Sequence, residues 1–114
     1  MIKAKLTETK TGTISLSIKG HAGAAEVGQD IVCASASILA YTVAQLVKDY
    51  GNSDMLNKKP TIMIKKGSTT VTCSPKKEYY DEVKHSFFVV QTGLNLLAHN
   101  YPQYVELEMF GQAE

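Results

Sequence analysis

The residues best suited to chemistry in this chain are a histidine and a cysteine twelve positions apart, His21 and Cys33. A thiol with an ordinary pKa of about 8.5 becomes a nucleophile when an imidazole or a helix N-terminus favours its thiolate. Between the two residues lie Gly23 and Gly28, which allow the chain to bend. The spacing therefore permits a Cys–His pair of the kind used in nucleophilic catalysis.

The residues around the cysteine predict the start of a helix. Asp30 stands immediately before Ile31-Val32-Cys33-Ala34, which opens a long apolar pattern, so we predict Asp30 as the N-cap and Cys33 in the first turn. There the unpaired N–H groups favour an anion, either the thiolate or a developing oxyanion. Ser37 follows on the same helical face, and its hydroxyl can bond the thiolate or a substrate carbonyl.

Each of these residues also has a purely structural explanation. Cysteine is among the most buried residue types, so Cys33 can be a small core residue. A histidine at the end of a strand is more often structural than catalytic, and Asp30 can cap a helix without any other function. Ser37 can simply bond its own backbone. The spacing alone leaves these alternatives open.

The same stretch resembles the signature of the bacterial ribosomal-processing cysteine protease family, also known as Prp or YsxB-like proteins. The resemblance rests on Gly20-His21-Ala22 followed by Gly28-Gln29-Asp30-Ile31-Val32-Cys33-Ala34-Ser35-Ala36-Ser37, and it extends to the overall length and element order. It implies a cysteine endopeptidase that removes the N-terminal extension of bacterial large-subunit ribosomal protein number twenty-seven during ribosome maturation. It also implies a homodimer.

The resemblance assigns roles to individual residues. Cys33 would be the nucleophile and His21 the general base and acid, while Asp30 and Ser37 match supporting positions. The segment 22–29 is similar to a mobile loop beside the substrate groove of the family. Its candidate substrate-loop residues are Gly23, Glu26 and Gly28.

Composition predicts one ordinary globular domain over residues 1–114, with 44% hydrophobic and 20% charged residues. The formal net charge is +1, and all 12 basic residues are lysines, so the chain has no arginine for bidentate phosphate contacts. Both observations argue against a dedicated nucleic-acid-binding protein.

We expect a cytoplasmic protein without a membrane segment. No apolar run approaches the roughly 18 residues of a membrane span, and the first residues alternate like a strand instead of forming a signal peptide. The two cysteines are then expected to be reduced. A zinc site built from His21, Cys33 and Cys73 lacks any supporting CxxC or HxxxH pair, so we expect no metal and no cofactor.

The periodicity of apolar residues predicts the elements that must position this site. Alternation predicts a hairpin over residues 2–19, a second hairpin over 61–74 that turns at Lys66-Gly67, and a final strand from Val105. Steps of three and four predict one helix over about 31–50 that ends at Gly51, and another that begins at Ser74-Pro75 and ends at Tyr101. The order ββαββαβ favours a single α+β domain with about five mostly antiparallel strands and two helices.

Two other functions fit parts of the pattern. A non-catalytic ribosome-associated binding module would use Cys33 only to fill space at a helix start, and its thiol would have ordinary reactivity. A thiol redox sensor would join Cys33 and Cys73 in a reversible disulfide. Because Cys73 shares the parity of Val71 on its predicted strand, we expect it to be a structural core residue instead.

Overall fold

The computed structural model describes the backbone of residues 1–20 and 27–113, and the side chains of residues 1–20 and 31–108. It confirms the predicted order ββαββαβ and the α+β class. The elements are β1 (Ile2–Thr9), β2 (Ile14–Lys19), α1 (Val27–Asn52), β3 (Thr61–Lys65), β4 (Ser68–Cys73), a short 3₁₀ turn (Lys77–Tyr79), α2 (Tyr80–Asn100) and β5 (Val105–Ala113).

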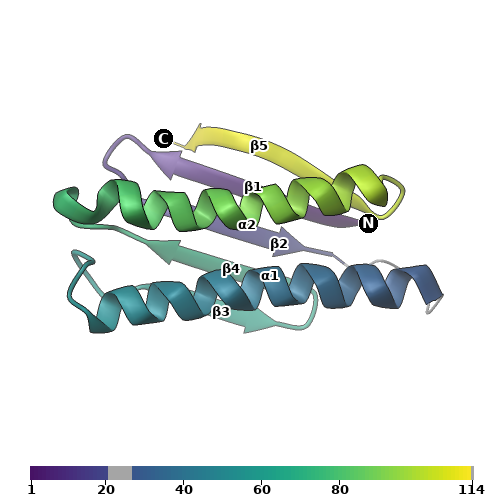
Figure 1. Cartoon of the computed structure of the whole chain (residues 1–114), viewed down its shortest axis with the longest axis horizontal. Helices are drawn as coiled ribbons and strands as arrows, with labels where there is room; N and C mark the ends of the chain where they lie inside the picture. Colours follow the sequence, from purple (N-terminus) through teal and green to yellow (C-terminus); the bar gives the residue numbers. More distant parts are fainter. Residues whose placement is uncertain (21–26, 114) are drawn as a thin grey trace.

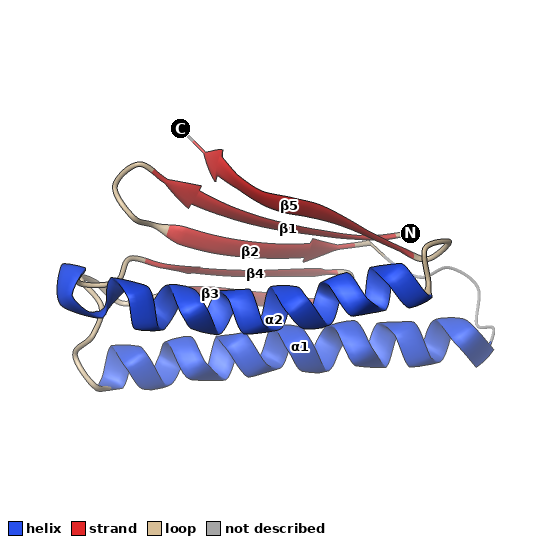
Figure 2. Ribbon diagram, turned by 45° about the horizontal axis from the view of Figure 1, so that its top comes forward, coloured by secondary structure: helices blue, strands red, loops and turns tan. Residues whose placement is uncertain are grey.

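The strands form one sheet in the order β3-β4-β2-β1-β5. Three neighbouring pairs are antiparallel, and β5 pairs with β1 in parallel, which confirms a mostly antiparallel sheet. Figures 1 and 2 show α1 and α2 side by side, running in opposite directions over the same face of the sheet, with α1 on the side of β3 and α2 nearer β1. The fold therefore has two layers.

Alternation along the strands builds the core between these layers. Side chains that face the helices are buried in every central strand, as Leu6 on β1, Leu16 on β2 and Val71 on β4 show. Their neighbours along each strand are serine, threonine and lysine residues on the uncovered face. A period of two thus separates the apolar side of the sheet from its solvated side.

Helix α1 extends beyond both predicted ends. Its buried stripe includes Val32, Val43 and Val47, as the apolar periodicity predicts. The predicted stop at Gly51 is wrong, because the helix is closed by Asp54, whose φ of 59° lies in the left-handed region. A bond from the N–H of Met55 to the carbonyl of Tyr50 closes the last turn across that residue.

The expectation that no segment is long and apolar enough to span a membrane is also wrong. The stretch Ile31–Asn52 of α1 has that length and apolarity, with a mean hydropathy of 1.5 over its most apolar window. In this fold the helix packs against α2 and the sheet along its buried stripe, and 33% of that window is buried. A core helix of a soluble protein has the same features.

Helix α2 begins later than predicted. Ser74 and Pro75 do not cap it, because this part of the chain is extended and pairs with residues 55–57: the N–H of Asn57 donates to the carbonyl of Ser74, and Leu56 forms a bridge with Pro75. A 3₁₀ turn then leads into the helix. The predicted core stripe is confirmed, since its buried residues are Val83, Phe87, Val90, Leu94 and Leu97.

The two helices approach closely at Gly93. A Cβ atom built there would lie 2.7 Å from Cδ2 of Leu39 on α1, nearer than real Cβ contacts. The glycine therefore lets the leucine side chain of α1 fill the space that a larger residue of α2 would take, as a close helix crossing requires.

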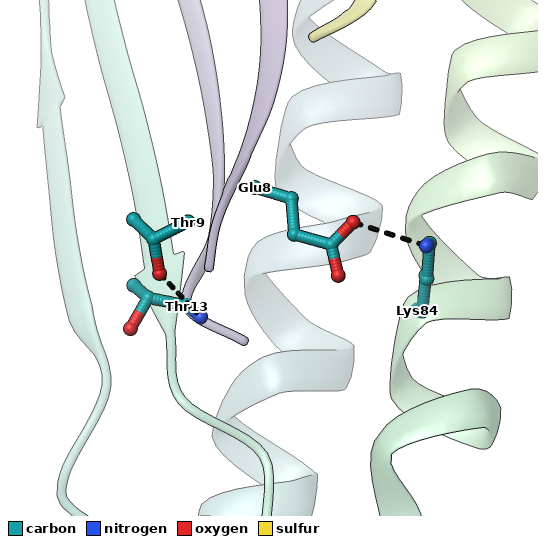
Figure 3. Close-up of polar contacts among 4 residues, drawn as sticks. All are labelled: Glu8, Thr9, Thr13 and Lys84. Atoms are coloured by element: carbon teal, nitrogen blue, oxygen red, sulfur yellow. Dashed lines mark hydrogen bonds and ion pairs between the residues drawn. The ribbon is translucent and has the colours of Figure 1, made fainter. Parts of the chain in front are cut away.

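One ion pair fastens α2 to the sheet at the end of the molecule away from the start of α1. The Nζ of Lys84 lies 3.0 Å from Oε1 of Glu8 on β1, and both side chains are largely buried (Figure 3). The ammonium also lies 5.4 Å from the ring centroid of Tyr80 and 5.6 Å from that of Phe88. Beside it, the N–H of Thr13 donates to the hydroxyl of Thr9 and closes the β1–β2 turn.

Cys73 is a core residue, as predicted, with 2% of its surface exposed. Burial raises the pKa of its thiol from 9.0 to about 12, so this sulfur stays protonated and inert at neutral pH. Its place at the end of β4 is remote from the start of α1 (Figure 1).

Burial of Cys73 predicts a loss of stability at alkaline pH. Above pH 9 the unfolded chain releases the thiol proton while the folded chain keeps it until about pH 12, so the free energy of unfolding falls as pH rises through this window. The slope contributed by one group is at most about 1.4 kcal/mol per pH unit. Urea unfolding at about pH 8 and about pH 10 should show a steeper loss for the wild type than for Cys73→Ala. Equal losses would contradict this role of burial.

Candidate active site

A hollow of about 340 Å³ opens between the first half of α1 and the end of the sheet where β3 turns into β4. Cys33, Ser37 and Tyr41 line it from the helix, spaced four residues apart so that all three share one face. Ile18, Ile64 and Thr69 line it from the sheet, and these residues are paired across β2, β4 and β3. The hollow therefore lies between α1 on one side and three strands of the sheet on the other.

Cys33 lines this hollow from the second turn of α1. It is half-buried and packs against an apolar cluster that includes Ile2, Leu97 and Val105. The cluster draws on β1, α2 and β5, so three elements hold the turn of α1 that carries the thiol. A nucleophile needs a fixed position with access from solvent, and this placement provides both.

The predicted helix start is wrong, and this changes the surroundings of the thiol. Helix α1 begins at Val27, so Asp30 is its fourth residue instead of its N-cap, and Cys33 is its seventh residue. The first four N–H groups of a helix are the ones without an internal partner. In α1 they belong to residues 27–30, one turn before Cys33, whose own N–H is within the helical bonding pattern. The helix N-terminus is therefore not the oxyanion site that the sequence predicted at Cys33.

Several predicted site residues have no described side chain. His21, Gly23 and Glu26 lie outside the described residues. Gly28 and Asp30 are described only by their helical backbone, so the predicted loop does not extend to residue 29 as expected. The structure accordingly brings together Cys33 and Ser37 from the predicted set.

The hydroxyl of Ser37 differs from the others on the helices. Ser35, Thr42 and Thr92 each donate to the carbonyl four residues earlier, which is the usual bond for a helical hydroxyl. The hydroxyl of Ser37 makes no such bond to any described residue. It faces the hollow one turn beyond Cys33. Its O–H is thus available to a group bound beside the thiol.

The hollow also contains residues that were not predicted as part of the site. Tyr41 on α1 and Ile64 on β3 are both about half exposed, at 48% and 49%, and line opposite walls. Lys65, the last residue of β3, and Lys66, in the turn that follows, also line it. Tyr41 continues the four-residue spacing of Cys33 and Ser37, a signal that was readable from the sequence, whereas the place of the lysines depends on how the hairpin folds over.

Gly20 fixes the chain immediately before His21. Its N–H donates to the carbonyl of Gly67 at 2.9 Å, which ties the end of β2 to the β3–β4 turn. Its φ of 103° lies in the left-handed half of the map, and a Cβ atom there would lie 2.2 Å from the carbonyl oxygen of Met1. Only glycine fits this position.

The second cysteine belongs to another part of the molecule. Cys73 pairs in register with Ile14, whereas Cys33 packs near Ile18. Four residues of β2 separate these two neighbours, roughly 13 Å at about 3.3 Å per residue. A disulfide needs Cα atoms within about 7 Å, so the redox-sensor alternative and a zinc site that uses both cysteines are incompatible with this fold. Among the described residues no three histidine, cysteine or acidic side chains are grouped as metal ligands.

The family model of cysteine protease Prp matches residues 1–106 of the chain. The chain belongs to this family. It is a cysteine protease, and the resemblance inferred from the residues around His21 and Cys33 is confirmed. No curated protein matches the chain at the level of sequence.

Solved structures share the fold of this Prp-family chain. SMU.848 from Streptococcus mutans is 24% identical, with a TM-score of 0.71 over 99% of this chain and 96% of that one. The essential ribosomal processing protease Prp from S. aureus, in complex with a covalently linked product peptide, is 21% identical, with a TM-score of 0.70 over 96% of this chain and 99% of that one. The same S. aureus protein with a substrate peptide is 20% identical, with a TM-score of 0.70 over the same shares.

Proposed function

We propose that this Prp-family protease is an endopeptidase of ribosomal processing that removes the N-terminal extension of large-subunit ribosomal protein number twenty-seven. Family membership supports the protease class. The S. aureus protein of the same fold is a ribosomal processing protease that binds a substrate peptide. The observation in this chain that carries the proposal is the half-buried Cys33, which shares one hollow with the available hydroxyl of Ser37.

The mechanism is acyl transfer through Cys33. His21 takes the thiol proton, the sulfur attacks the scissile carbonyl carbon, and the C–S bond forms as the carbonyl oxygen becomes an oxyanion. Collapse of this intermediate breaks the C–N bond, and the proton on His21 passes to the leaving amine. His21 then takes a proton from water, which attacks the thioester, and Cys33 leaves as the restored thiol.

The direct test is cleavage of a peptide that spans the processing site of the ribosomal protein. We expect one cut, identified by mass spectrometry of the products. Binding without any cut by the folded protein would favour the alternative, a non-catalytic ribosome-associated module. No cut and no binding would overturn the proposed substrate.

Ser37 is assigned the stabilisation of the oxyanion. It lies one helical turn from Cys33 on the same face, and its hydroxyl is not engaged by the helix backbone, as described above. Loss of one oxyanion donor lowers kcat strongly in other hydrolases. We expect Ser37→Ala to lower kcat by about tenfold or more with little change in KM, measured with the peptide substrate. Ser35→Ala is the control, because that hydroxyl bonds Ile31 and should leave kcat unchanged.

Asp30 is assigned the orientation of His21. Asp30 lies within the first turn of α1 and not before it, so it does not have the capping role that its sequence neighbourhood predicted. Asn has nearly the same shape but no charge, so Asp30→Asn separates an electrostatic role from a structural one. We expect unchanged thermal stability and a loss in kcat/KM of about tenfold or more, with a shifted pH profile. Unchanged activity would remove Asp30 from the mechanism.

We also propose a homodimer, in accord with the family resemblance. The outer surface of the two helices exposes Ile31, Ile38, Val89 and Leu96. Ile38 and Leu96 border a shallow hollow between α1 and α2, and an isologous contact of two such surfaces would cover it. Analytical ultracentrifugation should give the dimer mass for the wild type and the monomer mass for Leu96→Glu. A monomeric wild type would contradict this assignment.

We place the protein in the cytoplasm, where ribosomes mature, with no membrane partner and no direct nucleic-acid contact. The packing of α1 against α2 and the sheet supports the interpretation of this apolar helix as a core helix and not as a membrane span. The formal charge of +1 and the absence of arginine support a protein ligand instead of RNA.

A further inference from the structure

The sheet ends in a strand whose outer edge pairs with no other described strand, on the same side of the molecule as the candidate active site. β3 is the outermost strand, next to β4. The hairpin turns through two residues, Lys66 and Gly67, so the flanking pair Lys65 and Ser68 is hydrogen-bonded across it. Bonding alternates along an antiparallel pair, and the N–H and C=O groups of Ile62 and Ile64 therefore point away from β4.

Two hollows follow this edge. The hollow that contains Cys33 reaches β3 at Ile64. A second hollow, of about 720 Å³, lies between the last turns of α1 and the start of β3, where Lys48 and Gly51 face Pro60 and Ile62. Both hollows are bounded by α1 and β3, so they lie one after the other along the edge of β3, and we refer to this line as the path.

The far end of this path is basic. Lys48, Lys58 and Lys59 border the second hollow and are exposed, and among the described residues none of the three is in an ion pair. Among the described residues that line this hollow the one carboxylate is that of Asp54, and it is paired with Lys76 at 2.9 Å. An anionic group is therefore the ligand that complements this end.

The length of the path follows from the helix that borders it. Cys33 and Lys48 are fifteen residues apart on α1, which is about 22 Å at about 1.5 Å per residue. An extended peptide covers this distance in about six or seven residues. A segment of that length joins the thiol to the lysines only if it is extended, which is the conformation that pairs with a strand edge.

From these four observations, which rest on the peptidase function proposed above, we infer how the substrate is held. On one side of the scissile bond its chain leaves Cys33 between Tyr41 and Ile64, pairs by its backbone with the free edge of β3 at Ile64 and Ile62, and places an acidic residue against Lys48, Lys58 and Lys59. Specificity then depends on an extended conformation, an apolar side chain near the cut and a negative charge about six or seven residues away.

The first test uses the Cys33→Ala protein, which we expect to bind without cutting, and a fluorescein-labelled peptide of the ribosomal protein that extends about seven residues to each side of the cut. Each residue in turn is N-methylated, which removes one backbone donor. We expect affinity to fall by about fivefold to tenfold at two positions separated by one that tolerates the change. A scan without this period of two contradicts pairing with β3.

The second test compares two neighbours on β3 that are equally exposed, Ile64 at 49% and Met63 at 48%. Ile64 faces the hollow, whereas Met63 lies on the uncovered face of the sheet. We expect Ile64→Thr to weaken peptide binding severalfold and Met63→Thr to leave it unchanged. Equal effects would show that the peptide does not follow this wall.

The third test reverses charge at the far end. In the wild type, a peptide with Glu at the distal position should bind a fewfold more tightly than one with Lys, and the difference should shrink with salt. The double variant Lys58→Glu/Lys59→Glu should invert this order. The double variant Lys3→Glu/Lys19→Glu changes the net charge equally on the uncovered sheet face and should not invert it.

The outcomes separate this inference from the function on which it rests. Wild-type cleavage of the peptide, together with a flat N-methyl scan and no response to the charge reversals, overturns the substrate path and keeps the peptidase. Absence of cleavage of this peptide by the wild type overturns the proposed processing of the ribosomal protein, whatever the binding data show.

Discussion

The Cys33→Ala variant should fold normally and lose at least about ten-thousandfold in kcat/KM on the processing-site peptide. The thiol supplies the attacking atom. Among the described residues that line the hollow, Cys33 is the only cysteine. Alanine has a high helix propensity and fits the space of a half-buried cysteine in α1, so thermal unfolding should move by only a few degrees. Loss of activity with retained folding identifies Cys33 as the nucleophile.

The matched control is the other cysteine. Cys73→Ala removes a thiol that burial keeps protonated. This thiol lies at the last residue of β4, whereas the hollow is lined by the first residues of that strand, so the variant should retain the wild-type kcat/KM. An alkylating reagent followed by mass spectrometry should modify Cys33 and spare Cys73 in the native protein. If the purified Cys33→Ala protein still cuts, or if Cys73→Ala does not, the assignment of the nucleophile is wrong.

Gly20→Ala should destabilise the protein by about 3 kcal/mol or more. Two effects add at this position. A residue with a side chain is strained at a φ of 103°, and its Cβ atom would lie 2.2 Å from the backbone carbonyl oxygen of Met1, which cannot rotate away as a side chain can. Relief requires β1 or the end of β2 to move, and with it the bond from Gly20 to Gly67.

Gly12 provides the control, because its φ of 89° is similar but a Cβ atom there meets nothing nearer than the Tyr80 ring at 3.6 Å. Gly12→Ala should therefore show the conformational strain alone, about 1 kcal/mol. Urea unfolding of both variants measures the difference. Since Gly20 precedes His21, kcat/KM should also fall in Gly20→Ala under conditions where the protein is still folded, whereas Gly12→Ala should retain it. Equal destabilisation by the two substitutions would argue that the contact with Met1 relaxes freely.

Secondary-structure elements were predicted best where apolar residues repeat along the sequence with a simple period. The alternation of Ile14, Leu16 and Ile18 identified β2, and the Lys66-Gly67 turn identified the second hairpin, because a glycine with positive φ suits a two-residue turn. The parallel pairing of β5 with β1 was not predictable in this way, since alternation shows which face a strand buries but not which neighbour it joins.

The helix ends were less predictable because tertiary contacts decide them. Ser74 and Pro75 have the types of a helix start, yet pairing with residues 55–57 holds them extended. Gly51 has the type of a helix stop, yet the helix continues to Asn52, and a Cβ atom built on Gly51 would lie 3.3 Å from Cδ of Pro60. In each case the local preference is weaker than the packing around it.

In the candidate site, too, the residues set by local spacing were predictable and those set by tertiary contacts were not. Cys33 and Ser37 were predicted to share a face because they are four residues apart on one helix, and the structure places them in one hollow. Ile64 and Lys65 come from a strand thirty residues further along the chain, and only the sheet register brings them there. Local spacing thus found the chemistry, while the walls that would select a substrate depend on the complete fold.

The apolar cluster beneath Cys33 has a consequence for when this enzyme can act. The cluster joins Ile2, near the start of the chain, to Val105 on the last strand, and β1 and β5 are paired directly. Such contacts between distant parts of a chain form late and slowly compared with local ones. A nascent copy on the ribosome therefore has no supported thiol until β5 has been synthesised and has emerged. Synthesis of the protease is in this way separated from the onset of its activity.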